Sequence, residues 1–171
     1  MSARTKRPPA TIDVVERAAV WRRTLPDAPE ICRTAAAAAL ARGAAGVAGA
    51  ELSIVLADDA LIAKLNRTYR GIAKPTNVLS FASAEPARRR APLRLLGDVV
   101  VAHGTIAREA RAQGKTLADH LTHLVVHGVL HLLGFDHERA AEARRMETLE
   151  VAILGGLGVA DPYRTHESAH G

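Results

Sequence analysis

The sequence predicts an α+β fold, in which about five helices pack around a small four-stranded mixed sheet. Short apolar segments of strand type interleave with longer helical patterns along 171 residues, a length that suits one domain. Hydrophobic residues make up 48% of the chain and charged residues 24%, as in ordinary globular proteins. Aromatic residues make up only 3%, so the core must consist mainly of Leu, Val, Ile and Ala.

The first half of the chain alternates between strand and helix patterns. Residues 11–15 are typical of a short strand, and a loop containing two prolines follows. The Ala-rich stretch 30–42 predicts a helix because alanine has the highest helix propensity. Residues 51–56 alternate like a strand, and Asp58 or Asp59 can then cap another helix.

The second half of the chain adds two strands and then becomes helical. The strands are expected at 77–82 and 95–101, separated by the Arg-rich segment 84–94. Beyond them the pattern is helical, with breaks at Gly114 and Gly134. These elements supply the four strands and about five helices of the predicted fold.

The elements predict one catalytic domain over residues 11–164, between a flexible basic arm at 1–10 and a flexible tail at 165–171. Cys32 is the single cysteine, which excludes an intrachain disulfide and a cysteine-rich zinc ribbon. No apolar run reaches the ~18 residues of a membrane-spanning helix, and no secretory signal follows the basic start. The expected location is the cytoplasm, with no membrane partner.

Histidines cluster in the second half: five of the eight lie between residues 120 and 137. Thr116, with Asp119 three residues later, predicts a helix start of the capping-box type, and Gly134 predicts the end of that helix. On this helix His127 and His131 are one turn apart, so their rings leave the same face.

The spacing of three histidines predicts a metal centre. Two imidazoles one turn apart can share one ion at about 2.0–2.1 Å per bond, and a turn at Gly134 lets His137 reach the open side of that ion. The same spacing, with glycine at the turn, occurs in the zinc site of metzincin proteases, so we expect a metzincin-like metal-site helix. We predict one Zn²⁺ per chain, held by His127, His131 and His137, with another divalent transition metal as the alternative. Three imidazole ligands leave a fourth position open for water.

The general base of the metzincins is missing from this motif. Those proteases carry Glu directly after the first histidine, where this chain has Gly128. The nearest carboxylates are Asp136 and Glu138. Two roles stay open for Asp136: proton transfer, or accepting a hydrogen bond that orients a ligand histidine. His123, one turn before His127, is expected to line the site and meet substrate phosphate.

The segment HGVLHLLGFDH at 127–137 closely resembles the signature of the bacterial YbeY family, which are metal-dependent, single-strand-specific endoribonucleases of ribosomal RNA maturation. Two further blocks resemble this family in the same order: LNRTYRG with KPTNVLSF within 65–81, and LGDVVV at 96–101. The resemblance covers roughly residues 50–165 and departs at Phe135, where the family usually has Tyr.

The resemblance implies that the three histidines are the metal ligands and that Arg70 faces the metal across a cleft. A guanidinium there can bind a scissile phosphate through two hydrogen bonds and stabilise its added charge. The alternative for Arg70 is an interaction with the last carbonyls of its own helix. The resemblance also implies a strand beside the cleft over residues 76–81, with Asn77 and Ser80 available to substrate.

The charge balance favours a polyanionic partner. Lys and Arg number 23 against 18 Asp and Glu, giving a net charge of +5. Arg88, Arg89 and Arg90 follow one another between two predicted strands and are expected to contact the substrate backbone. Because the chain has few aromatic side chains for stacking on bases, binding should be mainly electrostatic, with weak sequence preference and strong salt dependence.

With the resemblance, these features predict a single-strand-specific endoribonuclease that cleaves RNA phosphodiesters with a metal bound by three histidines and acts in 16S rRNA 3′-end maturation and ribosome quality control. The predicted catalytic residues are Arg70 and Asp136. The expected partners are single-stranded RNA, ribosomal RNA and the small ribosomal subunit, without a small-molecule cofactor. Two alternatives stay open: a non-catalytic ribosome-assembly factor with a structural metal, and a zinc peptidase-type hydrolase.

Overall fold

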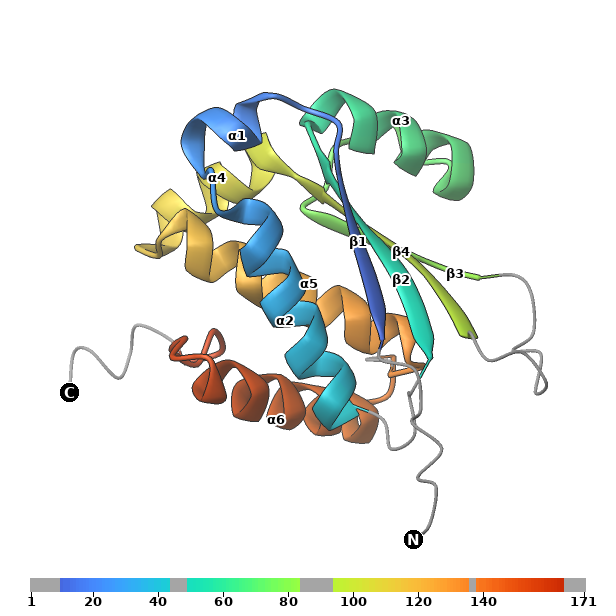
Figure 1. Ribbon diagram of the computed structural model, residues 1–171, viewed down its shortest axis with the longest axis vertical. Helices are drawn as coiled ribbons and strands as arrows, with labels where there is room; N and C mark the ends of the chain where they lie inside the picture. The colour runs from blue at the N-terminus through green and yellow to red at the C-terminus, as the bar shows by residue number, and fades with distance from the viewer. Residues whose placement is uncertain (1–9, 44–48, 84–93, 136–137, 165–171) are drawn as a thin grey trace, which may run out of the picture.

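The computed structural model describes residues 10–43, 49–83, 94–135 and 138–164, and within them the chain forms four strands and six helices (Figure 1). In chain order these are β1 (Thr11–Glu16), α1 (Val20–Thr24), α2 (Ala28–Gly43), β2 (Ala50–Ala57), α3 (Asp59–Arg70), β3 (Val78–Ala82), β4 (Arg94–Ala102), α4 (His103–Gln113), α5 (Leu117–Leu132) and α6 (Ala140–Gly156). The predicted α+β class and the four-stranded sheet are confirmed.

The sheet is mixed, with the strand order β1-β2-β4-β3. Strands β1, β2 and β4 run parallel, whereas β3 pairs antiparallel with β4 and forms one edge of the sheet. In that pairing Gly97 of β4 lies opposite Ala82. A Cβ atom at Gly97 would lie 2.0 Å from the carbonyl oxygen of Phe81, and its φ is 136°, so only glycine fits there.

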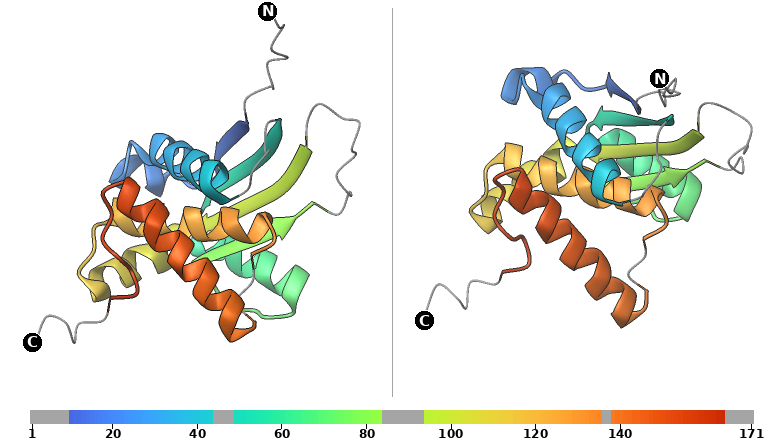
Figure 2. Two further views of the ribbon diagram at one scale, coloured as in Figure 1. Left: turned by 90° about the horizontal axis from the view of Figure 1, so that it is seen from below. Right: turned by 60° about the horizontal axis from the view of Figure 1, so that its bottom comes forward.

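The helices form layers on both faces of the sheet (Figures 1 and 2). Helices α2 and α5 pack on one face, and α6 packs against both of them. Helix α3 covers part of the other face, where a smaller apolar cluster includes Ile62, Leu79 and Val100. Helix α5 is therefore an inner helix, with the sheet on one side, α6 on the other and α2 beside it.

Helix α5 begins and ends where the sequence predicts. The Thr116 side chain accepts a hydrogen bond from the Asp119 backbone N–H at 3.0 Å. After Leu132 the chain turns through Gly134, whose φ is 98°, and the Phe135 N–H donates to the Leu130 carbonyl at 3.0 Å. The positive φ favours glycine at this position and directs the chain out of the helix.

Two features of the first half differ from the sequence prediction. Residues 20–24 form the short helix α1 in a stretch predicted to be loop, because Trp21 is fully buried and its indole N–H donates to the Ala57 carbonyl at 2.8 Å. Helix α2 begins at Ala28 rather than at residue 30, so Pro29 lies within its first turn, where proline is tolerated.

Several predictions fall on residues that are not described. The N-terminal arm, the C-terminal tail, the Asp136–His137 pair and the side chains of the Arg-rich segment 84–94 lie outside the described part of the chain. Within the described part, no helix is long and apolar enough to span a membrane.

Candidate active site

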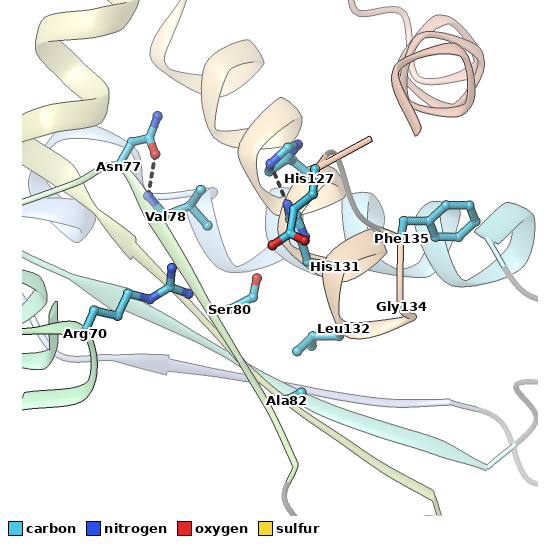
Figure 3. A pocket seen from close by; sticks show the side chains of 11 residues that line it. Arg70, Asn77, Val78, Ser80, Ala82, His127, His131, Leu132, Gly134 and Phe135 are labelled. Carbon is cyan, nitrogen blue, oxygen red and sulfur yellow. Dashed lines mark hydrogen bonds between the residues drawn. The ribbon is translucent and has the colours of Figure 1, made fainter. Parts of the chain in front are cut away.

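A cleft of about 670 Å³ opens between the end of α3, strand β3 and the second half of α5 (Figure 3). Strand β3 contributes alternate residues to it, because successive side chains of a strand point to opposite faces. The cleft is lined by Arg70, Asn77, Val78, Ser80, Ala82, His127, His131, Leu132, Gly134, Phe135 and Glu138.

Two of the three predicted ligand histidines converge in this cleft. The Nε2 atoms of His127 and His131 are 3.0 Å apart, and both rings are partly buried (Figure 3). Two nitrogen atoms bound to one Zn²⁺ at 2.0–2.1 Å each would be ~3–3.4 Å apart. The separation therefore suits a shared cation. His137, the third predicted ligand, lies outside the described residues.

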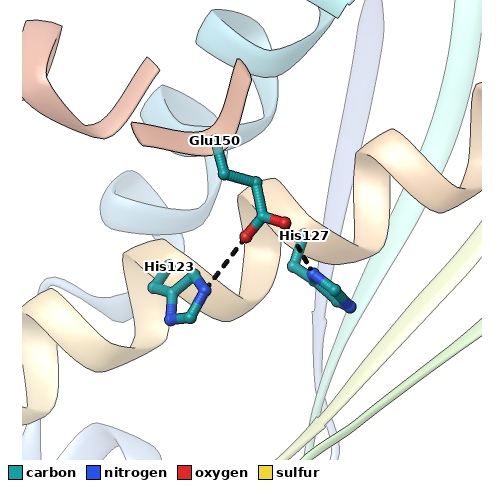
Figure 4. Close-up of side chains that lie close together, drawn as sticks. All are labelled: His123, His127 and Glu150. Carbon is teal, nitrogen blue, oxygen red and sulfur yellow. Dashed lines mark hydrogen bonds and ion pairs between the residues drawn. The ribbon is translucent and has the colours of Figure 1, made fainter. Parts of the chain in front are cut away.

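The other nitrogen of His127 is held by Glu150 of α6 (Figure 4). The Oε1 atom of Glu150 is 3.0 Å from His127 Nδ1, and its Oε2 atom is 3.0 Å from His123 Nε2. The Tyr163 hydroxyl donates to the same Oε2 at 2.9 Å. We call these four residues the Glu150 cluster.

Hydrogen bonding keeps the buried Glu150 carboxyl ionised. Burial opposes ionisation, but the hydrogen bonds from His123 and His127 outweigh it and lower the pKa of Glu150 to about 2. Burial, together with the Glu150 charge, raises the pKa of Tyr163 above its usual value. At neutral pH the cluster therefore contains a carboxylate that accepts hydrogen bonds and a phenol that donates one.

His123, His127 and Glu150 also form a group that could hold a metal ion, since their ligand atoms lie within 4.8 Å of one another. The described chain thus offers a His/Glu set suited to a metal. Within it, the 3.0 Å contacts of Glu150 are hydrogen-bond distances, and carboxylates commonly accept such bonds from metal-bound histidines. We therefore interpret Glu150 as a hydrogen-bond partner of His127, the predicted ligand, rather than as a ligand itself.

Arg70 lines the cleft together with both histidines, from the last turn of α3 (Figure 3). Helix α3 ends at this point because Gly71 adopts a φ of 71°, and its N–H caps the helix through the Arg67 carbonyl at 3.1 Å. The Asn66 side chain then donates to the Lys74 carbonyl at 2.9 Å, which holds the connection from α3 to β3. The local fold thus directs Arg70 to the same cleft as the histidines.

Asn77 and Ser80 also line the cleft, and both have structural contacts. The Ser80 hydroxyl donates to the Gly128 carbonyl at 2.9 Å and so joins β3 to α5. The Asn77 amide donates to Glu109 at 2.9 Å, while its oxygen accepts from the Val78 N–H at 2.7 Å. Substrate contact by these two residues stays a prediction.

The remaining predicted site residues either do not line the cleft or lie outside the described part of the chain. His123 belongs to the Glu150 cluster and is not among the residues lining the cleft, so its contact with substrate phosphate stays a prediction. Asp136 and the arginines 88–90 lie outside the described residues. Glu138, the other carboxylate near the motif, does line the cleft.

Sequence reasoning missed Glu150 and Tyr163. A usable signal was present for Glu150, which lies four residues after Met146 and three before Ile153, on the buried stripe of α6. A charged residue on an apolar stripe requires a partner, because an unpaired buried charge is strongly unfavourable. Nothing in the local pattern identifies Tyr163, because its contact with Glu150 depends on the path of the chain after α6.

Gly128 lies where α5 approaches the sheet most closely. A Cβ atom there would be 2.7 Å from Val99 Cγ1 and 3.1 Å from Ser80 Oγ. The position where metzincins carry their catalytic Glu is therefore occupied by neighbouring side chains, and a larger residue would push α5 off the sheet.

Comparison with known proteins agrees with the family resemblance of the histidine motif at 127–137. The family model described as "Endoribonuclease YbeY" matches residues 26–158. A curated protein of that name from Paramagnetospirillum magneticum is 55% identical over 147 residues, covering 84% of this chain and 89% of its own. Another from Alkalilimnicola ehrlichii is 48% identical over 167 residues, covering 98% and 99%.

Among solved structures, the solution structure of a Thermotoga maritima protein aligns with 91% of this chain and 100% of its own, at 21% identity and a TM-score of 0.48. The family assignment rests on the sequence matches, which cover most of the chain and in which about half of the aligned residues are identical. The chain belongs to the YbeY family.

Proposed function

We propose that this chain is an endoribonuclease that cleaves single-stranded RNA in the cleft, using Zn²⁺ bound by His127, His131 and His137. The observation that carries the proposal is the convergence of His127 and His131, with their Nε2 atoms 3.0 Å apart, in a cleft that Arg70 also lines. The names of the curated relatives support the reaction class.

We assign the following roles to the metal and to the residues of the cleft and the motif. Zn²⁺, when bound, would act as a Lewis acid on a phosphoryl oxygen or on water. Arg70 binds the scissile phosphate and stabilises the charge that develops on it during cleavage. Asp136, next to the third ligand in sequence, transfers a proton or orients His137.

The substrate-binding part of the proposal extends beyond the metal ligands. Asn77 and Ser80 contact the RNA from β3, and His123 meets a phosphate close to the metal. Arg88, Arg89 and Arg90 bind the RNA backbone further along. The net charge of +5 supports a polyanionic substrate of this kind.

The proposed cellular role is maturation of the 3′ end of 16S rRNA and ribosome quality control in the cytoplasm, with the small ribosomal subunit as a partner. The resemblance of the three sequence blocks to the YbeY family supports this role. A zinc peptidase is disfavoured, because a Cβ atom at Gly128 would already be 2.7 Å from Val99, and the protease Glu would have no room there.

The test compares purified wild-type protein with His131→Ala and Arg70→Glu on a defined single-stranded RNA and on the same sequence as a duplex. We expect both variants to lose cleavage and only His131→Ala to lose metal, as measured by elemental analysis. Arg67→Glu is the matched control, because Arg67 is exposed on the last turn of the same helix and is not among the residues lining the cleft.

Equal cleavage by all the proteins would identify a contaminating nuclease and refute the proposal. Metal binding without any cleavage by the wild type would favour the assembly-factor alternative. Analysis of the product ends adds the chemistry: a 2′,3′-cyclic phosphate would show that the 2′-hydroxyl, rather than water, is the first nucleophile.

A further inference from the structure

Glu150 is a fully buried carboxylate that connects three parts of the chain. It lies on α6 and accepts hydrogen bonds from His123 and His127 on α5 (Figure 4). It accepts another from Tyr163, in the segment after α6. We infer that Glu150 is a positioning residue, which holds His127 in the tautomer and ring orientation that present Nε2 to the cleft. The inference rests on the proposed role of His127 as a metal ligand.

The protons of the cluster follow from the chemistry of its groups. An ionised carboxylate only accepts hydrogen bonds, so each of its partners must donate. His127 therefore carries its proton on Nδ1, and the neutral ring has its lone pair on Nε2, the atom that lies 3.0 Å from His131 Nε2. In a histidine, the hydrogen bond made by one ring nitrogen fixes which nitrogen can bind a metal.

The carboxylate is itself held in place. Its Oε2 atom accepts hydrogen bonds from His123 Nε2 at 3.0 Å and from the Tyr163 hydroxyl at 2.9 Å. These two bonds direct Oε1 to His127. On α6 the neighbouring residues Met146, Ile153 and Leu154 are no more than 2% exposed and anchor the helix in the core. Three hydrogen bonds thus hold Glu150 in this orientation, in which Oε1 faces Nδ1 of His127.

The first test is metal affinity in Glu150→Gln. The glutamine side chain has a similar shape but one accepting and one donating end, so it cannot accept from both histidines. We expect Zn²⁺ affinity, measured by competition with a chromophoric chelator, to fall roughly 10- to 100-fold. Tyr163→Phe should lower it less, by under roughly 10-fold, because the His123 bond to Oε2 persists.

Thr148→Ala is the control, since Thr148 is exposed on the same helix. It should bind Zn²⁺ like the wild type. Circular dichroism and thermal melting identify variants that fold. A folded Glu150→Gln protein with wild-type affinity, alongside a His127→Ala protein that loses the metal, would overturn the inference and leave the proposed function standing. Full metal binding by His127→Ala would overturn the ligand role itself.

The second test reads the tautomer directly and needs no variant that could fail to fold. In metal-free, ¹⁵N-labelled wild-type protein in alkaline buffer, we expect NMR to report the proton of His127 on Nδ1, the nitrogen that faces Glu150. A proton on Nε2 would refute the inference. A purely structural role for Glu150 would lower stability but would not require this tautomer or change Zn²⁺ affinity in folded Tyr163→Phe.

Discussion

Gly128 shows how a single missing Cβ atom sets the distance between the metal-site helix and the sheet. Its backbone carbonyl accepts the Ser80 hydroxyl, and any Cβ there would meet Val99 at 2.7 Å. His127 and His131 lie on the same stretch of helix as Gly128 and are thereby held beside β3. The geometry of the cleft thus depends on a residue that has no side chain.

Gly128→Ala tests this packing. The added methyl group overfills a buried contact, which typically costs about 1–3 kcal/mol and should exceed the gain in helix propensity. We expect a lower free energy of unfolding in urea. Gly155→Ala on α6 is the control, because in the described part of the chain no atom outside its adjacent residues and the nearby backbone of its own helix lies within 4 Å of the added methyl position. It should be neutral or stabilising by up to ~1 kcal/mol. Equal stability of both variants would contradict the close approach.

Arg70 is the residue whose loss should affect catalysis without affecting the metal. Arg70→Ala should lower kcat roughly 10²- to 10³-fold, the usual effect of removing a donor to the transition state. Arg70→Lys should be intermediate, because an ammonium keeps the charge but lacks the two-pronged geometry. Steady-state cleavage of RNA together with metal analysis provides the measurement, with Arg67→Ala as the control. Loss of metal in Arg70→Ala would argue against a role confined to phosphate binding.

At the residue scale, contacts between residues close together in the sequence could be predicted. The spacing of His127 and His131 on one helix is enough to predict that their rings meet, and they do so at 3.0 Å. The contact of Glu150 with His127 joins residues 23 positions apart on different helices, so the helical period of either segment could not show it. The packing angle of α6 on α5 determines that contact.

At the scale of elements, Asp59 joins two helices that flank the sheet. It lies in the first turn of α3, and its carboxylate accepts the Thr105 N–H at 2.9 Å and the Arg108 guanidinium at 2.9 Å from the first turns of α4. Burial opposes its ionisation, but these hydrogen bonds outweigh that effect and hold the pKa of Asp59 below its usual value. The carboxylate therefore stabilises the start of α4.

Stability should depend on pH through Asp59. Because its pKa is lower in the folded state, its contribution is fully present above the pKa of the unfolded chain, about 3.9, and is lost as the pH falls through the folded value. Asp59→Asn should therefore lower the melting temperature at pH 7, and the difference from wild type should shrink below about pH 4. Thr148→Ala, a non-titrating change at an exposed site, should keep the same difference from wild type across this pH range. If the melting-temperature difference between Asp59→Asn and wild type instead grew as the pH fell, the pKa of Asp59 could not be lowered in the folded state.

The strands were the elements best predicted from sequence. The expected segments 11–15, 51–56, 77–82 and 95–101 correspond to β1, β2, β3 and β4 within one residue at each end. Alternation and flanking turn residues are local properties, so they locate strands well. Helix α1 was missed because its five residues are too few for a helical period, and the burial of Trp21 against Ala57 determines its position.

At the scale of the whole molecule, the net charge of +5 predicts how RNA binding responds to salt. Contacts with phosphates release counterions, so the logarithm of the affinity should fall linearly with the logarithm of the salt concentration, with a slope of about −0.7 per phosphate contact for a single strand. Fluorescence anisotropy with a labelled single-stranded RNA between 50 and 300 mM KCl, roughly the range in which screening changes most, measures the slope. An affinity independent of salt would contradict mainly electrostatic binding.

Because of Tyr163, truncating the chain soon after its last described helix should affect the histidine site. Its hydroxyl reaches the carboxylate that supports His127, at 2.9 Å, although it lies 13 positions beyond Glu150 and outside any helix. A fragment cut just after α6 would keep every proposed ligand and still lose this donor. Boundaries for expression, and for fusing reporters to this end, are therefore best placed downstream of residue 164.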